Sequence, residues 1–150
     1  DSVTGEASEV LGLTVDGIEL ELKGQLTDQL TIAAGYSNFD GETGSGGEPR
    51  EIPEYTFSVW STYQVTEKLG IGLGVTHQGE SNIKNNSTTP ILPDYTRVDL
   101  AAYYDIDEDM TLQLNIENLT DELYFPHAHS THQASVGEPL NARVSVRRNF

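Results

Sequence analysis

Near its middle the sequence reads Leu69-Gly70-Ile71-Gly72-Leu73-Gly74-Val75-Thr76, with a large apolar residue at every second position. Successive side chains of a β-strand point to opposite faces, so a period of two indicates a strand with one apolar face. An amphipathic helix repeats its apolar residues about every three to four positions instead. We therefore predict a strand over residues 69–78.

The same period extends outward from this stretch in both directions. Six further segments alternate apolar with small or polar residues: 17–26, 29–38, 55–65, 95–105, 110–118 and 140–150. A tilted strand needs about 9–11 residues to cross a bilayer, which is the length of these segments. The sequence predicts an all-β protein, an antiparallel up-and-down meander of seven to eight strands that forms part of a transmembrane β-barrel.

The connections alternate in length, which supports the barrel interpretation. Short connections are predicted at 27–28, 66–68 and 106–109, and long ones at 39–54, 79–94 and 119–139. Outer-membrane barrels combine short periplasmic turns with long extracellular loops. This pattern places the C-terminal Phe150 on the periplasmic side.

The flanking segment 1–16 admits two interpretations. Residues 10–15 are either the upper part of the first strand or a separate strand, joined to it by a hairpin turn at Asp16-Gly17. Eight strands can close into a small barrel. Seven strands leave two open edges, which we expect to pair with other copies of the chain. We prefer seven strands, with 17–150 carrying all of them.

The apolar face faces either lipid or a protein core. Tyrosines lie near predicted strand ends, as in the aromatic girdles of membrane barrels; they are Tyr36, Tyr55, Tyr63, Tyr95 and Tyr104. The opposite faces carry Thr, Ser, Gln, Asn and Gly, which suit a polar lumen. The alternative is a soluble β-sandwich or β-barrel with a binding groove, in which the apolar face is the core.

Composition excludes several classes of function. The formal net charge is −16, so binding to a nucleic-acid phosphate backbone is not expected. No cysteine is present, which excludes disulfides and thiolate metal sites. The sequence contains no nucleophile elbow, phosphate loop or Ser–His–Asp set, so we predict neither an enzyme nor a resident cofactor.

Four stretches resemble the TonB-dependent siderophore receptor family. They are Gly17-Ile18-Glu19-Leu20-Glu21; the strand entry Ile52-Pro53-Glu54-Tyr55, with Tyr63 at its end; Leu92-Pro93-Asp94-Tyr95-Thr96-Arg97-Val98-Asp99; and Leu112 to Tyr124, which contains Asn115, Asn118, Leu119, Asp121 and Tyr124. The terminal Phe150 also fits the family, although Arg148 stands where an apolar residue is usual. The resemblance covers residues 17–150 and implies the last third of a barrel of about 22 strands with a plugged lumen.

These family-motif residues have a predicted structural role. Asn and Asp side chains hydrogen-bond nearby backbone and fix the start of a loop. We therefore expect Asn118, Asp121 and Tyr124 to shape the loop rather than to contact a ligand. Trp60 is expected to face the lumen and to find a partner for its indole N–H.

The loop 119–139 carries the candidate ligand residues His127, His129 and His132. Imidazole can bind zinc, copper or nickel, but no metal-binding helix motif is present. Whether these histidines bind a metal stays open, and contact with a ferric chelate is the preferred hypothesis because binding residues concentrate on loops.

The resemblance implies a function for the parent protein. That function is the capture of a ferric siderophore outside the cell and its import with energy from the TonB complex, in the bacterial outer membrane. The implied partners are the siderophore, the TonB complex, the plug domain and membrane lipid. The alternative is a small stand-alone outer-membrane barrel with a structural or adhesion role.

Overall fold

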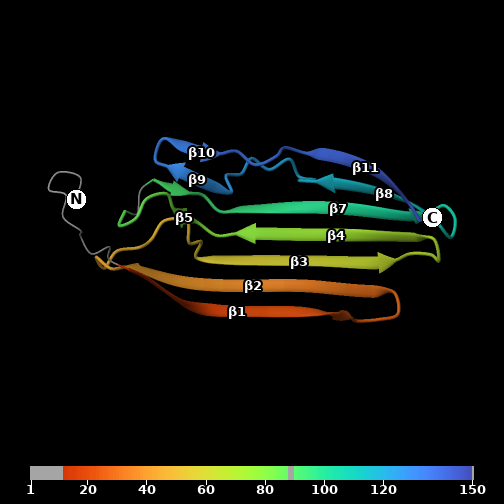
Figure 1. Cartoon of the computed structure of the whole chain (residues 1–150), viewed down its shortest axis with the longest axis horizontal. Helices are drawn as coiled ribbons and strands as arrows, with labels where there is room; N and C mark the ends of the chain where they lie inside the picture. Colours follow the sequence, from red (N-terminus) through yellow and green to blue (C-terminus); the bar gives the residue numbers. More distant parts are fainter. Residues whose placement is uncertain (1–11, 88–89, 150) are drawn as a thin grey trace.

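The computed structural model describes residues 12–87 and 90–149 and consists of strands and connecting loops (Figure 1). Seven long strands form one antiparallel sheet in the order β1-β2-β3-β4-β7-β8-β11. Their bounds are β1 Leu13–Gln25, β2 Leu30–Thr43, β3 Tyr55–Gln64, β4 Leu69–Gln78, β7 Tyr95–Asp105, β8 Met110–Glu117 and β11 Asn141–Arg148. The predicted meander of seven strands is confirmed. No helix within the described ranges is long and apolar enough to span a membrane.

The short connections share one design. Each begins with an apolar residue followed by a Thr or Asp. The side-chain oxygen of that Thr or Asp accepts a hydrogen bond from a backbone N–H group. Thr27 Oγ1 accepts from Leu30 N at 3.0 Å, Thr66 Oγ1 accepts from Leu69 N at 3.0 Å, and Asp107 Oδ1 accepts from Asp109 N at 2.9 Å. These side chains supply acceptors for backbone N–H groups at the turn. All three turns lie at the right-hand end of the sheet in Figure 1, and the long loops gather at the other end.

The alternative of a hairpin turn at Asp16-Gly17 is wrong. Both residues lie inside β1, where they pair with Asp40 and Phe39 of β2 in an unbroken register. The described residues therefore form seven long strands rather than eight, and residues 13–15 are the upper part of the first strand. Residues 1–11, the rest of the flanking segment, lie outside the described residues.

The loop predicted over 39–54 is shorter, because β2 continues to Thr43. Along this extension the two faces exchange polarity: Val15 and Phe39 share a face with Glu19, whereas Asp16 and Asp40 share a face with Leu20. The Phe39 ring lies over Gly17, where any side chain would collide with it. The extension thus continues the ladder beyond the apolar band, with polar side chains on the face that is apolar below.

The apolar face of the sheet is uncovered. Leu20, Leu22 and Val144 are 61%, 58% and 65% exposed. Within residues 12–87 and 90–149 no second sheet packs on this face, and the buried apolar residues are few: Ile83, Leu92, Ala101, Tyr124 and Ala128. A soluble sandwich would bury this face, so that alternative is wrong. Exposed apolar surface of this extent marks contact with membrane lipid or with another protein.

The register also assigns the aromatic residues to faces. Tyr36, Tyr55, Tyr63 and Tyr104 lie on the apolar face, as expected for interfacial girdles. Tyr95 does not, because it is paired with Gln78 on the polar face. Its ring packs on Tyr124 with centroids 4.6 Å apart. The assignment of Tyr95 to a girdle was therefore wrong, since nearness to a strand end does not determine the face.

Trp60 lies on the polar face and covers glycines of the next strand. A Cβ on Gly72 would come within 2.5 Å of Trp60 Cζ2, and one on Gly74 within 2.5 Å of Trp60 Cε3. The indole N–H donates to Thr62 Oγ1 at 3.2 Å. The glycines that alternate along β4 thus provide the space in which the indole lies flat against the wall, and the expected partner for its N–H is present.

We expect Gly74→Val to destabilise the folded protein by about 1–3 kcal/mol through overpacking against Trp60, although valine itself favours strands. Trp60→Ala in the same protein should recover most of that loss. Urea unfolding in lipid vesicles of both single variants and the double variant measures the coupling. Effects that add to within about 0.5 kcal/mol would show that the indole does not occupy this space.

Candidate functional site

The candidate site is the group of loops at one end of the sheet. We name them loop A (residues 44–54), loop B (79–94) and loop C (118–140). Loop B contains the short hairpin of β5 Ser81–Asn82 and β6 Ile91–Leu92, and loop C contains β9 His127–Ser130 and β10 Gln133–Ser135. Two of the three long connections therefore contain short strands. In Figure 1 these elements lie together at the left-hand end of the sheet.

Loops A and B are joined along a polar seam. Glu51 N of loop A donates to Asn82 O of loop B at 2.8 Å, and Asn86 N of loop B donates to Glu48 O of loop A at 2.7 Å. Asn86 also accepts from Thr43 Oγ1 at 2.6 Å through its side-chain oxygen. Both Glu51 and Asn86 have positive φ, 57° and 58°. The seam thus holds two residues in a backbone conformation that most side chains avoid.

Loop C packs on loop B through a small apolar cluster. Ile83, Leu92 and Ala128 are buried together, and Phe125 packs against them. A hydrogen bond from loop A supports this packing: Glu51 Oε1 accepts from Ala128 N at 3.3 Å. All three loops therefore form one lobe, with loop A bonded to both of the others.

Asn118 fixes the start and the end of loop C. Its buried side chain donates from Nδ2 to Glu122 O at 2.9 Å and to Glu138 O at 3.0 Å, and its Oδ1 accepts from Glu122 N at 2.9 Å. Its own N–H donates to Asp99 Oδ1 at 2.9 Å. One amide side chain therefore ties together the two ends of a loop of more than twenty residues.

Neighbouring motif residues extend this network. Asp121 Oδ1 accepts from Leu140 N at 2.9 Å, next to the start of β11. Arg97 forms an ion pair with Asp99 Oδ2 at 2.9 Å and donates to Tyr124 OH at 3.3 Å. Tyr124 packs against Gly137, where any side chain would collide with its ring. The contacts of this cluster are to other parts of the chain itself.

Most of the remaining motif residues lie apart from this cluster, and Leu119 lies beside it. Pro53 precedes β3 and Pro93 precedes β7. Tyr63 OH donates to Gln29 Oε1 at 3.0 Å near the short turns, and Asn115 Oδ1 accepts from Gln113 Nε2 at 2.9 Å on the polar face. Leu119 N donates to Val98 O at 2.7 Å. Phe150 lies outside the described residues.

The three candidate histidines lie on the β9–β10 hairpin. His127 Nε2 is 2.9 Å from Ser135 Oγ, and the rings of His129 and His132 meet edge to face with centroids 6.3 Å apart. In the described part of the chain, no group of three or more His, Cys, Asp or Glu residues is placed to hold a metal ion. His127 bonds to Ser135, whereas His129 and His132 contact each other, so the three imidazoles do not form one set of metal ligands.

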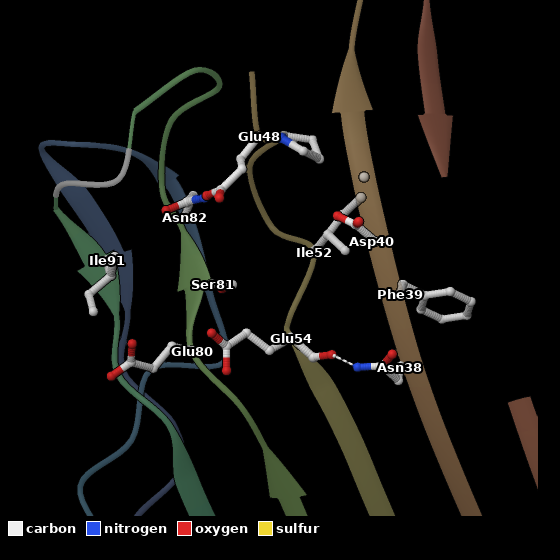
Figure 2. A pocket seen from close by; sticks show the side chains of 12 residues that line it. Asn38, Phe39, Asp40, Glu48, Ile52, Glu54, Glu80, Ser81, Asn82 and Ile91 are labelled. Atoms are coloured by element: carbon white, nitrogen blue, oxygen red, sulfur yellow. Dashed lines mark hydrogen bonds between the residues drawn. The ribbon is translucent and has the colours of Figure 1, made fainter. Parts of the chain in front are cut away.

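A cleft of about 510 Å³ opens between β2 and loops A and B. Figure 2 shows its lining, which includes the carboxylates of Asp40, Glu48, Glu54 and Glu80 and no basic side chain. Asn38 Nδ2 donates to Glu54 O at 2.7 Å at its lower end (Figure 2). A cleft lined in this way repels anions. Sequence reasoning missed it because these carboxylates are up to forty residues apart.

We expect Asn118→Ala to loosen loop C, because it removes three partly buried hydrogen bonds to the backbone at a position with φ of 53°. The cost should be about 3 kcal/mol. Added protease should then cleave loop C of the purified protein about tenfold faster. Asn115→Ala, three residues earlier in β8, is the matched control, and equal cleavage of both variants would contradict the role of Asn118.

Comparison with known proteins identifies the family. The family model described as "TonB dependent receptor-like, beta-barrel" matches residues 8–119. The probable TonB-dependent siderophore receptor PiuA of Acinetobacter baumannii is 32% identical over 153 residues, covering 91% of this chain and 20% of the relative. The probable TonB-dependent receptor BfrD of Bordetella pertussis is 30% identical over 152 residues, with 91% and 20% covered.

Solved structures agree with these relatives. The crystal structure of PiuA superposes with a TM-score of 0.78 at 31% identity, covering 91% of this chain and 22% of that one. The ferripyoverdine receptor of the outer membrane of Pseudomonas aeruginosa, bound to ferripyoverdine, gives 0.79 at 28% identity, with 92% and 20% covered. The chain spans about one fifth of the length of these relatives. It belongs to the TonB-dependent receptor-like β-barrel family of outer-membrane proteins.

Proposed function

We propose that this chain forms one section of the wall, with three external loops, of a receptor that binds a ferric siderophore and imports it with energy from the TonB complex. The observation that carries the proposal is the family match, together with relatives that are siderophore receptors. The family is one of transport receptors rather than of enzymes. The section corresponds to the C-terminal part of the barrel.

Each surface of the sheet has a role in this proposal. The apolar face contacts outer-membrane lipid, and the polar face, with Trp60, Arg97 and Asp99, contacts a plug domain contributed by the rest of the receptor. The joined loops form part of the external ligand-binding surface, to which His127, His129 and His132 contribute exposed imidazoles. The family motif around Asn118 holds loop C in position for this role.

A rigid loop lobe suits ligand capture. Binding is weakened by whatever ordering the loops undergo when the ligand arrives. Here the bonds between loops A and B and the apolar cluster of Ile83, Leu92 and Ala128 order the lobe before any ligand is present. Less of the binding free energy is then lost to loop ordering.

Deletion of the gene that encodes this chain should abolish uptake of at least one ferric siderophore, and the complete gene should restore it. Uptake of radioactive iron by iron-starved cells is measured with tricatecholate, trihydroxamate and mixed-ligand siderophores. Loss of TonB should have the same effect as the deletion. An unchanged uptake of every siderophore in the deletion strain, under iron starvation that induces the protein, would contradict the proposal.

An antibody against loop C provides the accompanying control. It should detect an outer-membrane protein several times larger than 16.4 kDa, which becomes more abundant when iron is withdrawn. A band at 16.4 kDa whose abundance does not depend on iron would instead indicate a small protein without an import function.

A further inference from the structure

A second cavity lies among the tips of the three loops. It measures about 650 Å³ and is lined by Arg50 of loop A, by Ile83, Lys84 and Asn85 of loop B, and by Thr131 and His132 of loop C. Pockets of about 300–1,000 Å³ accommodate small organic ligands. No single loop forms this cavity, so it exists only because the loops are joined.

The charge of this cavity is opposite to that of the chain. The chain has 24 Asp and Glu residues against 8 Lys and Arg. Two of those eight, Arg50 and Lys84, line this cavity beside His132, and its lining contains no carboxylate. The chain has three times as many acidic as basic residues, whereas the charged residues that line this cavity are all basic.

The seam between loops A and B separates this cavity from the acidic cleft. Glu48 and Glu54 of loop A line the cleft, whereas Arg50 between them lines the cavity. In loop B, Glu80 lines the cleft and Lys84 the cavity. The two sides of one seam therefore carry opposite charge, and an anion repelled by the cleft is attracted to the cavity.

Arg50 is held in place from both neighbouring loops. Its backbone N–H donates to Asn85 Oδ1 at 2.8 Å, and its Nη1 donates to His129 O at 3.2 Å. Its ion pair with Glu51 is long, at 3.8 Å, and exposed, so it neutralises the guanidinium only weakly. Among the described residues Lys84 has no ion pair, so its ammonium group is available to a ligand.

We propose that Arg50 and Lys84, with His132 at the rim, form a docking site for a net-anionic, oxygen-rich ferric chelate. This inference rests on the proposed function and deepens it by naming the charge class of the ligand. A guanidinium and an ammonium bind carboxylate, catecholate or hydroxyl oxygens through charge-assisted hydrogen bonds. Their field also raises the rate of encounter with an anion.

The test compares the complete receptor with its Arg50→Gln/Lys84→Gln variant in neutral detergent, which removes anionic lipid as a competing source of ligand. The probes are a ferric tricatecholate, which is strongly anionic, and a neutral ferric trihydroxamate. Quenching of tryptophan fluorescence reports binding. Lys68→Gln is the matched control, because Lys68 lies in the short turn at the opposite end of the sheet, with Nζ donating to Ile106 O at 3.4 Å.

The anionic chelate should bind the double variant about tenfold more weakly than the wild type or Lys68→Gln, as expected for the loss of two partly exposed ion pairs. Added salt should weaken its binding to the wild type more than to the variant. Equal binding to all three proteins, or binding of the neutral chelate alone, would overturn the docking site and leave the import function standing. A wild-type receptor that binds neither chelate overturns the docking site, and uptake by intact cells decides the import function separately.

Discussion

The structure depends on one constraint, which is that every backbone N–H and C=O group in the hydrocarbon core of a membrane needs a partner inside the protein. The antiparallel ladder from β1 to β11 meets it over seven strands with an unbroken register between successive pairs. Because successive residues of a strand face opposite sides, the same ladder sorts side chains into one apolar and one polar surface.

Two edges remain outside this ladder. Among the described strands, β1 pairs only with β2, and β11 pairs only with β8. This chain spans about one fifth of the length of its relatives. We therefore expect these edges to pair with further strands in a complete barrel. Isolated edges would pair with other copies of the chain, so the self-association expected from the sequence applies to the segment alone.

Where the ladder leaves the membrane, side chains take over the task of satisfying the backbone. At the short turns one hydroxyl or carboxylate oxygen per turn is sufficient. At the long loops Asn118 bonds to the backbone at both ends of loop C, and Glu51 of loop A accepts from Ala128 N of loop C. This arrangement explains how long external loops can be ordered without a large hydrophobic core, and why the charges on either side of their seam are held apart.

The sequence predicted the strands because period two is a local signal that each segment carries by itself. It offered the extension of β1 as one of two interpretations and did not predict that of β2, because the polarity of the two faces is exchanged at Gly17 and Phe39 and the alternation then looks interrupted. The short pairs β5–β6 and β9–β10 contain two to four residues per strand, too few for a periodic signal.

The site was predicted less completely than the fold, for a different physical reason. Asn118, Asp121 and Tyr124 were recognised as a motif, but the partners of Asn118 are the carbonyls of Glu122 and Glu138, and a backbone carbonyl leaves no mark in a sequence. The meeting of Arg50 with Lys84 depends on the packing of separate loops. Arg50 is nevertheless the one basic residue between Lys23 and Lys68, a signal that sequence reasoning could have used.

The most direct test of the membrane-wall account is a nitroxide scan along β8, Met110–Glu117, in the complete receptor embedded in lipid. This chain contains no cysteine, so each introduced cysteine marks a single position within it. The account predicts collision with oxygen dissolved in the lipid to be highest at Met110, Leu112, Leu114 and Ile116 and low at the residues between them. A profile without this alternation, or with its maxima at Thr111, Gln113 and Asn115, would contradict it.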